Sequence, residues 1–230
     1  MREAEARRFI EENTAPCAPP LLPEIRLRLA TEVTPLWRAT ESFLRTHGIE
    51  PPFWAFAWSG GQAIARLVLD RPELVRGKVV LDLAAGSGLC AIAAARAGAR
   101  RVVAVDTDPL AAVAITVNAE DGGVSVEAHV EDMLCGAGLP AWAAGAEVVL
   151  AGDVCYDAAM TRVVFPWLRA RAGEGRTVLL GDPGRAYLPN EGIEEITRYR
   201  VPVIDDVEGT AEKWGVVYRV ALAGGGASVA

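Results

Sequence analysis

The sequence predicts an α/β protein: a Rossmann-like, doubly wound, mostly parallel sheet of seven strands with an antiparallel edge strand, plus a short N-terminal extension. Apolar, β-branched runs alternate with alanine-rich helical runs from residue 78 to residue 183. Such alternation is typical of right-handed βαβ units that build a parallel sheet. Near the end, two strand-like runs are separated only by a turn-rich stretch. Runs joined in this way favour an antiparallel pair at the edge of the sheet.

The individual elements follow from their composition and their ends. Residues 78–85 are almost continuously apolar, which predicts a buried strand. The next run consists of small residues and stops at Gly98, which predicts a helix. Pro109 stands where proline is favoured, in the first turn of a helix. The expected strands are 78–85, 101–108, 124–130, 146–154, 176–183, 195–203 and 213–222, and the expected helices are 88–98, 109–120 and 158–172.

The chain is long enough for one sizeable core, since it has 230 residues of which 51% are hydrophobic. We expect residues 1–50 to form an N-terminal extension of helix, strand and helix that packs on the core. Residues 51–222 are expected to form the main domain, and residues 223–230 a flexible tail. The first residues show no apolar signal segment, and no apolar run reaches a membrane-spanning length. These features predict a cytoplasmic protein with no membrane partner.

Charge and cysteine usage narrow the possible partners. The formal net charge of −7 argues against tight binding to nucleic acid, which depends on lysines and arginines that neutralise phosphates. The four cysteines show no C-x-x-C spacing, so they predict neither a zinc site nor a disulfide framework, and they fit a reducing compartment. We expect a monomer that needs no metal.

The loop after the first strand fits two kinds of nucleotide site. The run GSGLCA at 86–91 matches a relaxed dinucleotide fingerprint, and Asp106 follows at the distance of a ribose-binding acid. The run DLAAGSG at 82–88 equally matches the acid and glycine cluster of S-adenosylmethionine sites. A plain strand-to-helix turn is a third interpretation, because small-residue loops are common in alanine-rich chains.

The rest of the chain favours S-adenosylmethionine over a dinucleotide. There are only two histidines, no tyrosine is followed four residues later by lysine, and no room remains for a separate substrate domain. The chain therefore has a loop like that of a dehydrogenase but lacks the residues that hydride transfer requires. Asp82, inside the first strand, can instead fix the amides of the loop and lie near the amino-acid end of S-adenosylmethionine.

Several motifs together resemble a known family. The runs VVLDLAAGSG, VVAVDTDP, EDM and LAGDVCYD resemble the successive cofactor motifs of class I methyltransferases. The runs PPFWAFAWSGGQAIARLVLD, DVCYD and LLGDPGR are similar to the seven-β-strand protein-lysine methyltransferases with an aspartate-x-x-tyrosine motif, and closest to those that modify the β-subunit of electron transfer flavoprotein. The resemblance covers roughly residues 23–218. One departure is Ala84, which occupies the place of the family's first loop glycine.

The resemblance implies a cofactor site for S-adenosylmethionine. Gly86 and Gly88 would let the backbone pass beside the methionine and ribose. Asp106 would accept hydrogen bonds from the ribose hydroxyls, since Asp108 is the better candidate for capping the next helix. Asp132 follows the third strand and would contact the adenine amino group, or else is a surface-loop residue.

Two aromatic residues precede a glycine pair and a helix. The resemblance places Trp58 beside the cofactor, where Gly60 and Gly61 would allow a close approach. Trp54 is expected to pack in the core, because burial is the commoner use of aromatic side chains.

Asp153 and Tyr156 are the candidate catalytic residues. Their run DVCY ends the fourth strand, at the edge where doubly wound sheets bind ligands. A strand-end turn is the alternative interpretation. A free lysine has a pKa of about 10.4, so the site must aim an ammonium and then let it lose a proton. Asp153 can orient the amine and Tyr156 can bond to it or line the channel, while water carries the proton away.

The sequence leaves more than one class of methyl acceptor possible. Enzymes that methylate base amino groups or glutamine amides usually place two prolines and an aromatic residue after the acid or amide, and this chain has Val154 and Cys155 there. The resemblance implies the β-subunit of electron transfer flavoprotein as the protein substrate. A small amine or a ribosomal protein is the alternative acceptor, and a non-catalytic S-adenosylmethionine-binding protein is a third class.

Overall fold

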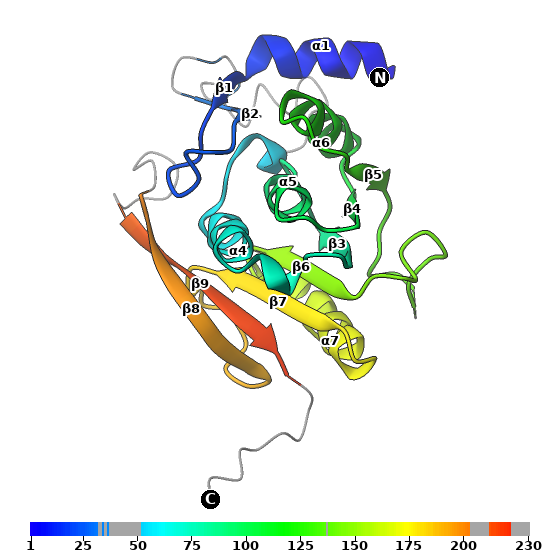
Figure 1. The fold of residues 1–230 in the computed structure, drawn as a ribbon, viewed down its shortest axis with the longest axis vertical. Coiled ribbons are helices and arrows are strands. Elements are labelled where there is room, and N and C mark those ends of the chain that lie inside the picture. The colour runs from blue at the N-terminus through cyan, green and yellow to red at the C-terminus, as the bar shows by residue number, and fades with distance from the viewer. Residues whose placement is uncertain (32–33, 35, 37–51, 137, 203–211, 222–230) are drawn as a thin grey trace, which may run out of the picture.

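The sheet has the predicted mixed topology. In the computed structural model, which describes residues 1–31, 34, 36, 52–136, 138–202 and 212–221, the strand order is β5-β4-β3-β6-β7-β9-β8 (Figure 1). The strands are β3 (Val79–Leu83), β4 (Arg101–Asp106), β5 (Glu127–Val130), β6 (Val148–Gly152), β7 (Thr177–Asp182), β8 (Ile193–Pro202) and β9 (Glu212–Val220). Strands β3 to β7 pair in parallel, and β9 pairs antiparallel with both β7 and β8. The prediction of a mostly parallel sheet with an antiparallel edge is confirmed.

Helices cover both faces of this sheet (Figure 1). On one face, α4 (Ser59–Asp70), α5 (Leu89–Arg96) and α6 (Pro109–Asp121) pack against alternate strand residues such as Val80 and Leu150. On the other, α7 (Ala158–Gly173) packs against the intervening residues, such as Leu81 and Val149. Because both of their faces are buried, the parallel strands β3, β4, β6 and β7 are nearly continuous apolar runs, whereas the edge strand β5 is partly exposed.

The order in which strands are added to the sheet changes direction between β3 and β6, although the two strands are parallel. From β3 the chain proceeds outward to β4 and β5, then returns to the other side of β3 to form β6 and β7. Ligands of doubly wound sheets bind at such a switch point, outside the carboxyl ends of the strands. The loops after Leu83 and Gly152 leave the sheet at this place.

Helix α4 begins almost in contact with the backbone of the sheet. A Cβ atom built on Gly60 would lie 2.4 Å from the carbonyl oxygen of Gly181, and one built on Gly181 would lie 2.2 Å from that of Gly60. A Cβ on Gly152 would lie 2.9 Å from the Cα of Gly61. These glycines seat the N-terminus of α4 on β6 and β7, next to the switch point.

The N-terminal segment packs on α6. It contains α1 (Glu3–Asn13) and a two-stranded antiparallel sheet of β1 (Ala15–Cys17) and β2 (Leu27–Leu29), and the amide of Arg28 donates to Asn118 Oδ1 at 2.7 Å. A single strand was expected here, so the hairpin is an addition. The expected second helix and the boundary at residue 50 fall largely in residues 37–51, outside the described residues. The expected tail, residues 223–230, also lies outside them. The division into domains therefore stays a prediction.

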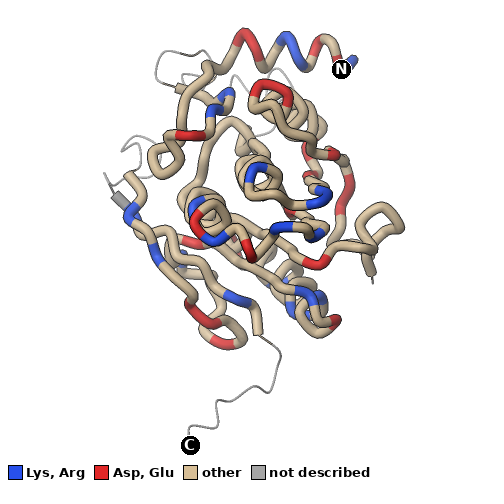
Figure 2. Tube along the Cα trace, viewed as in Figure 1, with Lys and Arg blue, Asp and Glu red and all other residues tan. Residues whose placement is uncertain are grey.

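Charges of both signs are interspersed along the trace, as in α1 and β8 (Figure 2). All four cysteines are among the described residues and are free. No described helix is both long and apolar enough to cross a bilayer.

Candidate active site

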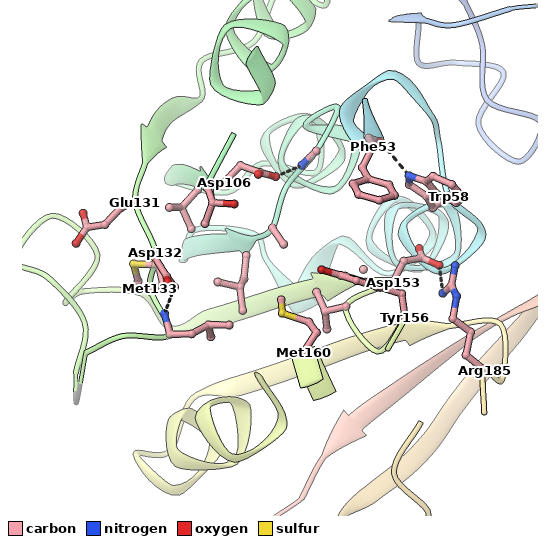
Figure 3. A pocket seen from close by; sticks show the side chains of 18 residues that line it. Phe53, Trp58, Asp106, Glu131, Asp132, Met133, Asp153, Tyr156, Met160 and Arg185 are labelled. Atoms are coloured by element: carbon pink, nitrogen blue, oxygen red, sulfur yellow. Dashed lines mark hydrogen bonds and ion pairs between the residues drawn. The ribbon is translucent and has the colours of Figure 1, made fainter. Parts of the chain in front are cut away.

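A cavity of about 250 Å³ opens at the switch point. Six of the eight predicted site residues line it (Figure 3): Trp58, Gly86, Asp106, Asp132, Asp153 and Tyr156. A second, smaller hollow of about 40 Å³ is lined by Asp82 and shares several residues with the first, among them Trp58, Gly86 and Asp153. The structure thus gathers seven of the predicted residues, from segments up to 98 positions apart in sequence, around one connected site.

Gly88, the eighth, lines neither hollow. It is the residue before α5 and has a left-handed backbone, with φ of 80°. A Cβ atom at this position would lie 3.2 Å from the Cγ1 atom of Ile115 on α6. The described contacts of Gly88 are therefore with a helix, and its predicted contact with the cofactor stays a prediction.

Asp106 holds the glycine loop in place. One carboxylate oxygen accepts a hydrogen bond from the amide of Gly86 at 2.9 Å, and the other accepts from the amide of Asp108 at 3.1 Å. Asp108 in turn caps α6 by accepting from the amide of Leu110 at 2.8 Å, as predicted. Asp106 is partly exposed at the cavity, so its carboxylate keeps acceptor positions for a ligand.

Asp82 supplies the side-chain acceptor that an N-cap residue would normally give to α5. Its carboxylate, 2% exposed, accepts a hydrogen bond from the amide of Ala91 at 2.9 Å, because Gly88 at the helix start has no side chain to do so. Burial raises the pKa of Asp82 to about 7, the Ala91 amide opposes that rise, and the charge of Asp106 adds to it. Asp82 was expected to fix amides of the loop; its partner is instead an amide in the first turn of α5, and the loop amide of Gly86 bonds to Asp106.

Asp132 lies in an exposed turn at the far end of the cavity (Figure 3). One carboxylate oxygen accepts from the amide of Leu134 at 2.9 Å and the other from the thiol of Cys135 at 2.8 Å. These bonds, the one from Cys135 first, lower the pKa of Asp132. The carboxylate is thus ionised and held by its own turn, with its remaining acceptor positions toward solvent and cavity.

Aromatic side chains form the opposite wall. The indole of Trp58 donates to the carbonyl oxygen of Phe53 at 2.9 Å, and its ring lies 5.7 Å from that of Phe56. The rings of Phe53 and Tyr156 stack at 6.0 Å with an inclination of 27°. Both are about half exposed, so a flat apolar surface borders the opening (Figure 3). Trp54, by contrast, is 1% exposed and packs in the core as predicted.

Asp153 is nearly buried and already has two partners. One carboxylate oxygen accepts from the amide of Gly61 in the first turn of α4 at 2.7 Å, and the other pairs with Arg185 at 2.6 Å (Figure 3). Burial raises the pKa of Asp153, while Arg185 and the Gly61 amide oppose that rise. A carboxylate has about four acceptor positions, so two of them remain.

Several lining residues were not singled out from the sequence. Arg185 belongs to the quoted run GDPGR, but nothing in its spacing shows that it reaches Asp153. Phe53 belongs to the run PPFWAF, where the larger tryptophans are the more obvious candidates. The other lining residues that the sequence did not indicate are apolar or strand-flanking: Leu83, Val105, Thr107, Glu131, Met133, Leu134, Gly152, Val154 and Met160. Among the described residues, no group of three histidine, cysteine or acidic side chains could hold a metal ion.

Solved structures share this fold. A putative RNA methyltransferase from Pyrococcus horikoshii aligns over 96% of this chain and 99% of its own, with 14% identity and a TM-score of 0.53. The likeness extends to the whole architecture and, at that identity, concerns the fold alone. The family model described as ribosomal protein L11 methyltransferase (PrmA) matches residues 66–152, the part that carries the glycine loop and β6.

Named relatives are much more similar in sequence. An electron transfer flavoprotein beta subunit lysine methyltransferase from Xenopus laevis is 41% identical over 181 residues, which cover 78% of this chain and 71% of that protein. The human protein of the same name is 38% identical over 194 residues, covering 84% of this chain and 71% of its own length. Both alignments cover more than three quarters of this chain and more than two thirds of the relative. This chain therefore belongs to the family of electron transfer flavoprotein β-subunit lysine methyltransferases.

Proposed function

We propose that this protein transfers methyl groups from S-adenosylmethionine to lysine side chains of the β-subunit of electron transfer flavoprotein. Its membership of the family that carries this name supports the proposal most strongly. The site supports it independently: a buried carboxylate and a half-exposed aromatic pair line the same cavity as the glycine loop.

The donor set of the cavity fits S-adenosylmethionine. Asp106 keeps free acceptor positions for the ribose hydroxyls. Next to it, the loop residues Ala84 and Gly86 line the cavity, so their backbone can lie close to the cofactor. The apolar side chains of Val105, Met133 and Leu134 line the part next to Asp132, which suits a flat adenine ring. Asp82 and Trp58 border the smaller hollow, which suits the amino-acid end. When bound, this cofactor supplies an electrophilic methyl group on a sulfonium.

Asp153 would receive the lysine. Its two remaining acceptor positions can hold an ammonium, and its negative charge, which is nearly buried, attracts the protonated side chain. Tyr156 and Phe53 offer an apolar wall for the methylene groups of the lysine. Alignment of the nitrogen with the methyl carbon and sulfur would supply most of the acceleration.

The proton must leave before the nitrogen can form its new bond to carbon. A carboxylate beside an amine favours the charged form, so Asp153 positions the amine and is a poor final base. Water at the open mouth of the cavity can carry the proton away. The phenol of Tyr156 does not serve as an anionic base near neutral pH, because burial and the charges of Asp157 and Asp106 raise its pKa.

A second acceptor is worth testing because residues 66–152 match the ribosomal protein L11 methyltransferase model. That match covers the glycine loop and β6 but ends before Tyr156 and Arg185. The residues that would meet the acceptor therefore lie mostly outside it, whereas the lysine methyltransferase relatives cover most of the chain.

The test is a transfer assay with defined acceptors. The purified protein is incubated with labelled S-adenosylmethionine and, separately, with the β-subunit of electron transfer flavoprotein, ribosomal protein L11 and a protein-free small-molecule extract. We expect label on lysines of the flavoprotein subunit, identified by mass spectrometry as mass increases in steps of one methyl group. Label confined to L11 or to small molecules would reject the proposed substrate, and no binding of S-adenosylmethionine in a calorimetric titration would reject the proposed cofactor.

A further inference from the structure

Three charged side chains meet at the ends of β6 and β7. Arg185 lies 2.6 Å from one oxygen of Asp153 and 3.3 Å from one oxygen of Asp182, all measured from the same guanidinium nitrogen. The carboxylates are almost inaccessible, with side chains 8% and 0% exposed, and the arginine side chain is 22% exposed on the cavity. The cluster joins two neighbouring strand ends that come from different parts of the sequence.

We propose that Arg185 is a positioning residue for methyl transfer: anchored by Asp182, its guanidinium keeps the Asp153 carboxylate ionised and aimed at the incoming lysine. The inference deepens the proposed function and rests on the role given there to Asp153. It assigns a task to a residue whose side chain bonds to the two carboxylates.

The anchoring of Arg185 distinguishes this role from that of a mobile surface side chain. The amides of Gly184 and Arg185 both donate to Asp182 Oδ1 at 2.7 Å, so Asp182 fixes the backbone of the turn. The other oxygen of Asp182 contacts the guanidinium. Because Asp182 holds both the backbone and the head group of Arg185, an approaching ammonium would not readily displace the arginine and would bind beside it.

The charge balance supports a second cation. Two carboxylates and one guanidinium leave a net charge of −1 in a nearly buried cluster. Among the described residues, the other titratable groups that interact with Asp153 are the thiols of Cys90 on α5 and of Cys155, and burial raises the pKa of both, so they are neutral. From α4 the amide of Gly61 faces the carboxylate. A lysine ammonium would therefore neutralise the cluster, and Arg185 alone does not.

The loss of Arg185 should act through the protonation of Asp153. Burial raises the pKa of Asp153, and Arg185 is the first influence that opposes this. Without the guanidinium the pKa should rise further, so the carboxylate would be protonated over a wider pH range and would hold an ammonium less well. As pH increases the carboxylate ionises again, and part of the lost activity should return.

The experiment compares Arg185→Ala with Arg162→Ala, which removes an exposed arginine from α7. For each variant the affinity for S-adenosylmethionine, single-turnover methyl transfer from pH 6 to pH 9 and the titration of the Asp153 carboxyl by carbon NMR are measured. For Arg185→Ala we expect cofactor affinity within about twofold of the parent, transfer reduced at least tenfold at pH 7, a smaller reduction at pH 9, and a higher pKa of Asp153. Millimolar guanidinium should restore part of the transfer, and Arg162→Ala should match the parent.

Two outcomes would overturn the inference: an unchanged titration of Asp153 in Arg185→Ala, or a loss of transfer that is the same at every pH and is not restored by guanidinium. Arg185→Gln serves as a second variant if Arg185→Ala fails to fold, and it should shift the pH profile in the same direction, because it keeps a polar side chain beside Asp153 but removes the positive charge. The NMR titration needs no methyl acceptor. A failure of the proposed substrate would therefore leave that measurement intact, and the two failures can be told apart.

Discussion

Ala84 and Asp153 share an uncommon backbone conformation at equivalent places in the fold. Their φ angles are 52° and 59°, and no other described non-glycine residue has a positive φ. Ala84 directly follows β3 and Asp153 directly follows β6, the two strands that flank the switch point, and both line the cavity. A left-handed conformation costs an L-residue about 1–2 kcal/mol, and such strain clusters at functional sites. The two residues therefore mark where the sheet turns its backbone toward a ligand.

Ala84→Gly should stabilise the protein. Glycine adopts a positive φ without a steric penalty, which outweighs its greater freedom in the unfolded chain, so we expect a gain of about 1 kcal/mol in the free energy of unfolding. Urea denaturation measures it. Ala85→Gly is the matched control, because Ala85 has no positive φ, and it should lose about 0.5–1 kcal/mol. Equal effects of both changes would show that Ala84 carries no strain.

Asp153→Asn should abolish most of the methyl transfer and leave the fold intact. Asparagine tolerates a left-handed backbone and can still accept a hydrogen bond from the Gly61 amide, but it lacks the charge that attracts an ammonium. We expect a loss of at least tenfold, about 1.4 kcal/mol of transition-state stabilisation, in single-turnover transfer. The affinity for S-adenosylmethionine should change little.

Tyr156→Phe is the companion variant. It keeps the ring that stacks on Phe53 and should cost less than Asp153→Asn if the ring serves only as a wall. A loss as large as that of Asp153→Asn would instead assign the hydroxyl to the lysine nitrogen. If Asp153→Asn transferred methyl at the parent rate, Asp153 would be reduced to a residue of the strand-end turn.

Asp106→Ala should weaken the binding of S-adenosylmethionine by about 1–3 kcal/mol, the range for losing hydrogen bonds to a charged group. Part of that loss reflects the loop, because Asp106 also accepts from the amide of Gly86. Asp106→Asn separates the two contributions, since it keeps one acceptor for the loop but loses the charge. Calorimetric titration of both variants measures the effect. An unchanged dissociation constant in Asp106→Ala would remove Asp106 from the ribose.

The sequence predicted the sheet, and it named many of the residues that line the cavity, because both depend largely on local patterns. The run 78–85 is apolar on both faces of its strand, and Asp82, Gly86 and Asp106 lie within one strand-loop-helix-strand unit, where spacing alone fixes their positions. The pairing of Arg185 with Asp153 could not be predicted in this way. It joins residues 32 positions apart, and only the parallel register of β6 and β7 makes them neighbours.

The function of the glycine pair was only partly predicted. Gly60 and Gly61 were expected to allow a close approach to a cofactor, and Gly61 does line the smaller hollow. Gly60 instead meets the backbone of Gly181, a contact between a helix and a strand more than 100 positions away. No local pattern reports such a contact, because a glycine needed for packing and a glycine needed for a ligand look alike in sequence.

Gly60→Ala should be strongly destabilising. The new Cβ atom would lie 2.4 Å from a backbone oxygen of β7 and 2.7 Å from the carboxylate of Asp153, and neither β7 nor the buried ion pair can easily move. Overpacking of this kind costs about 1–3 kcal/mol, which thermal or urea unfolding will detect. Gly145→Ala is the control, since it has open space around it and no positive φ. A neutral Gly60→Ala would mean that α4 does not rest on the sheet as closely as described.

The pH dependence of stability should reveal the burial of Asp82. Its pKa is about 7 in the folded protein, against about 4 for an exposed aspartate, so between these values the folded state binds more protons than the unfolded state. Stability from this residue is fully present below about pH 4 and falls as pH rises toward 7, by at most a few kcal/mol.

Asp82→Asn, which can still accept from the Ala91 amide, should therefore unfold with a free energy close to that of the parent at pH 4 and larger than that of the parent at pH 8. Urea unfolding at both pH values, with Glu191→Gln as an exposed-carboxylate control, measures the difference. If the two variants changed with pH in the same way, Asp82 would titrate like a surface carboxylate, and its role as a buried acceptor for the first turn of α5 would be wrong. A confirmed difference would mean that the protein retains a costly buried carboxylate beside the glycine loop, as expected of a group kept to meet the positively charged amino-acid end of the cofactor.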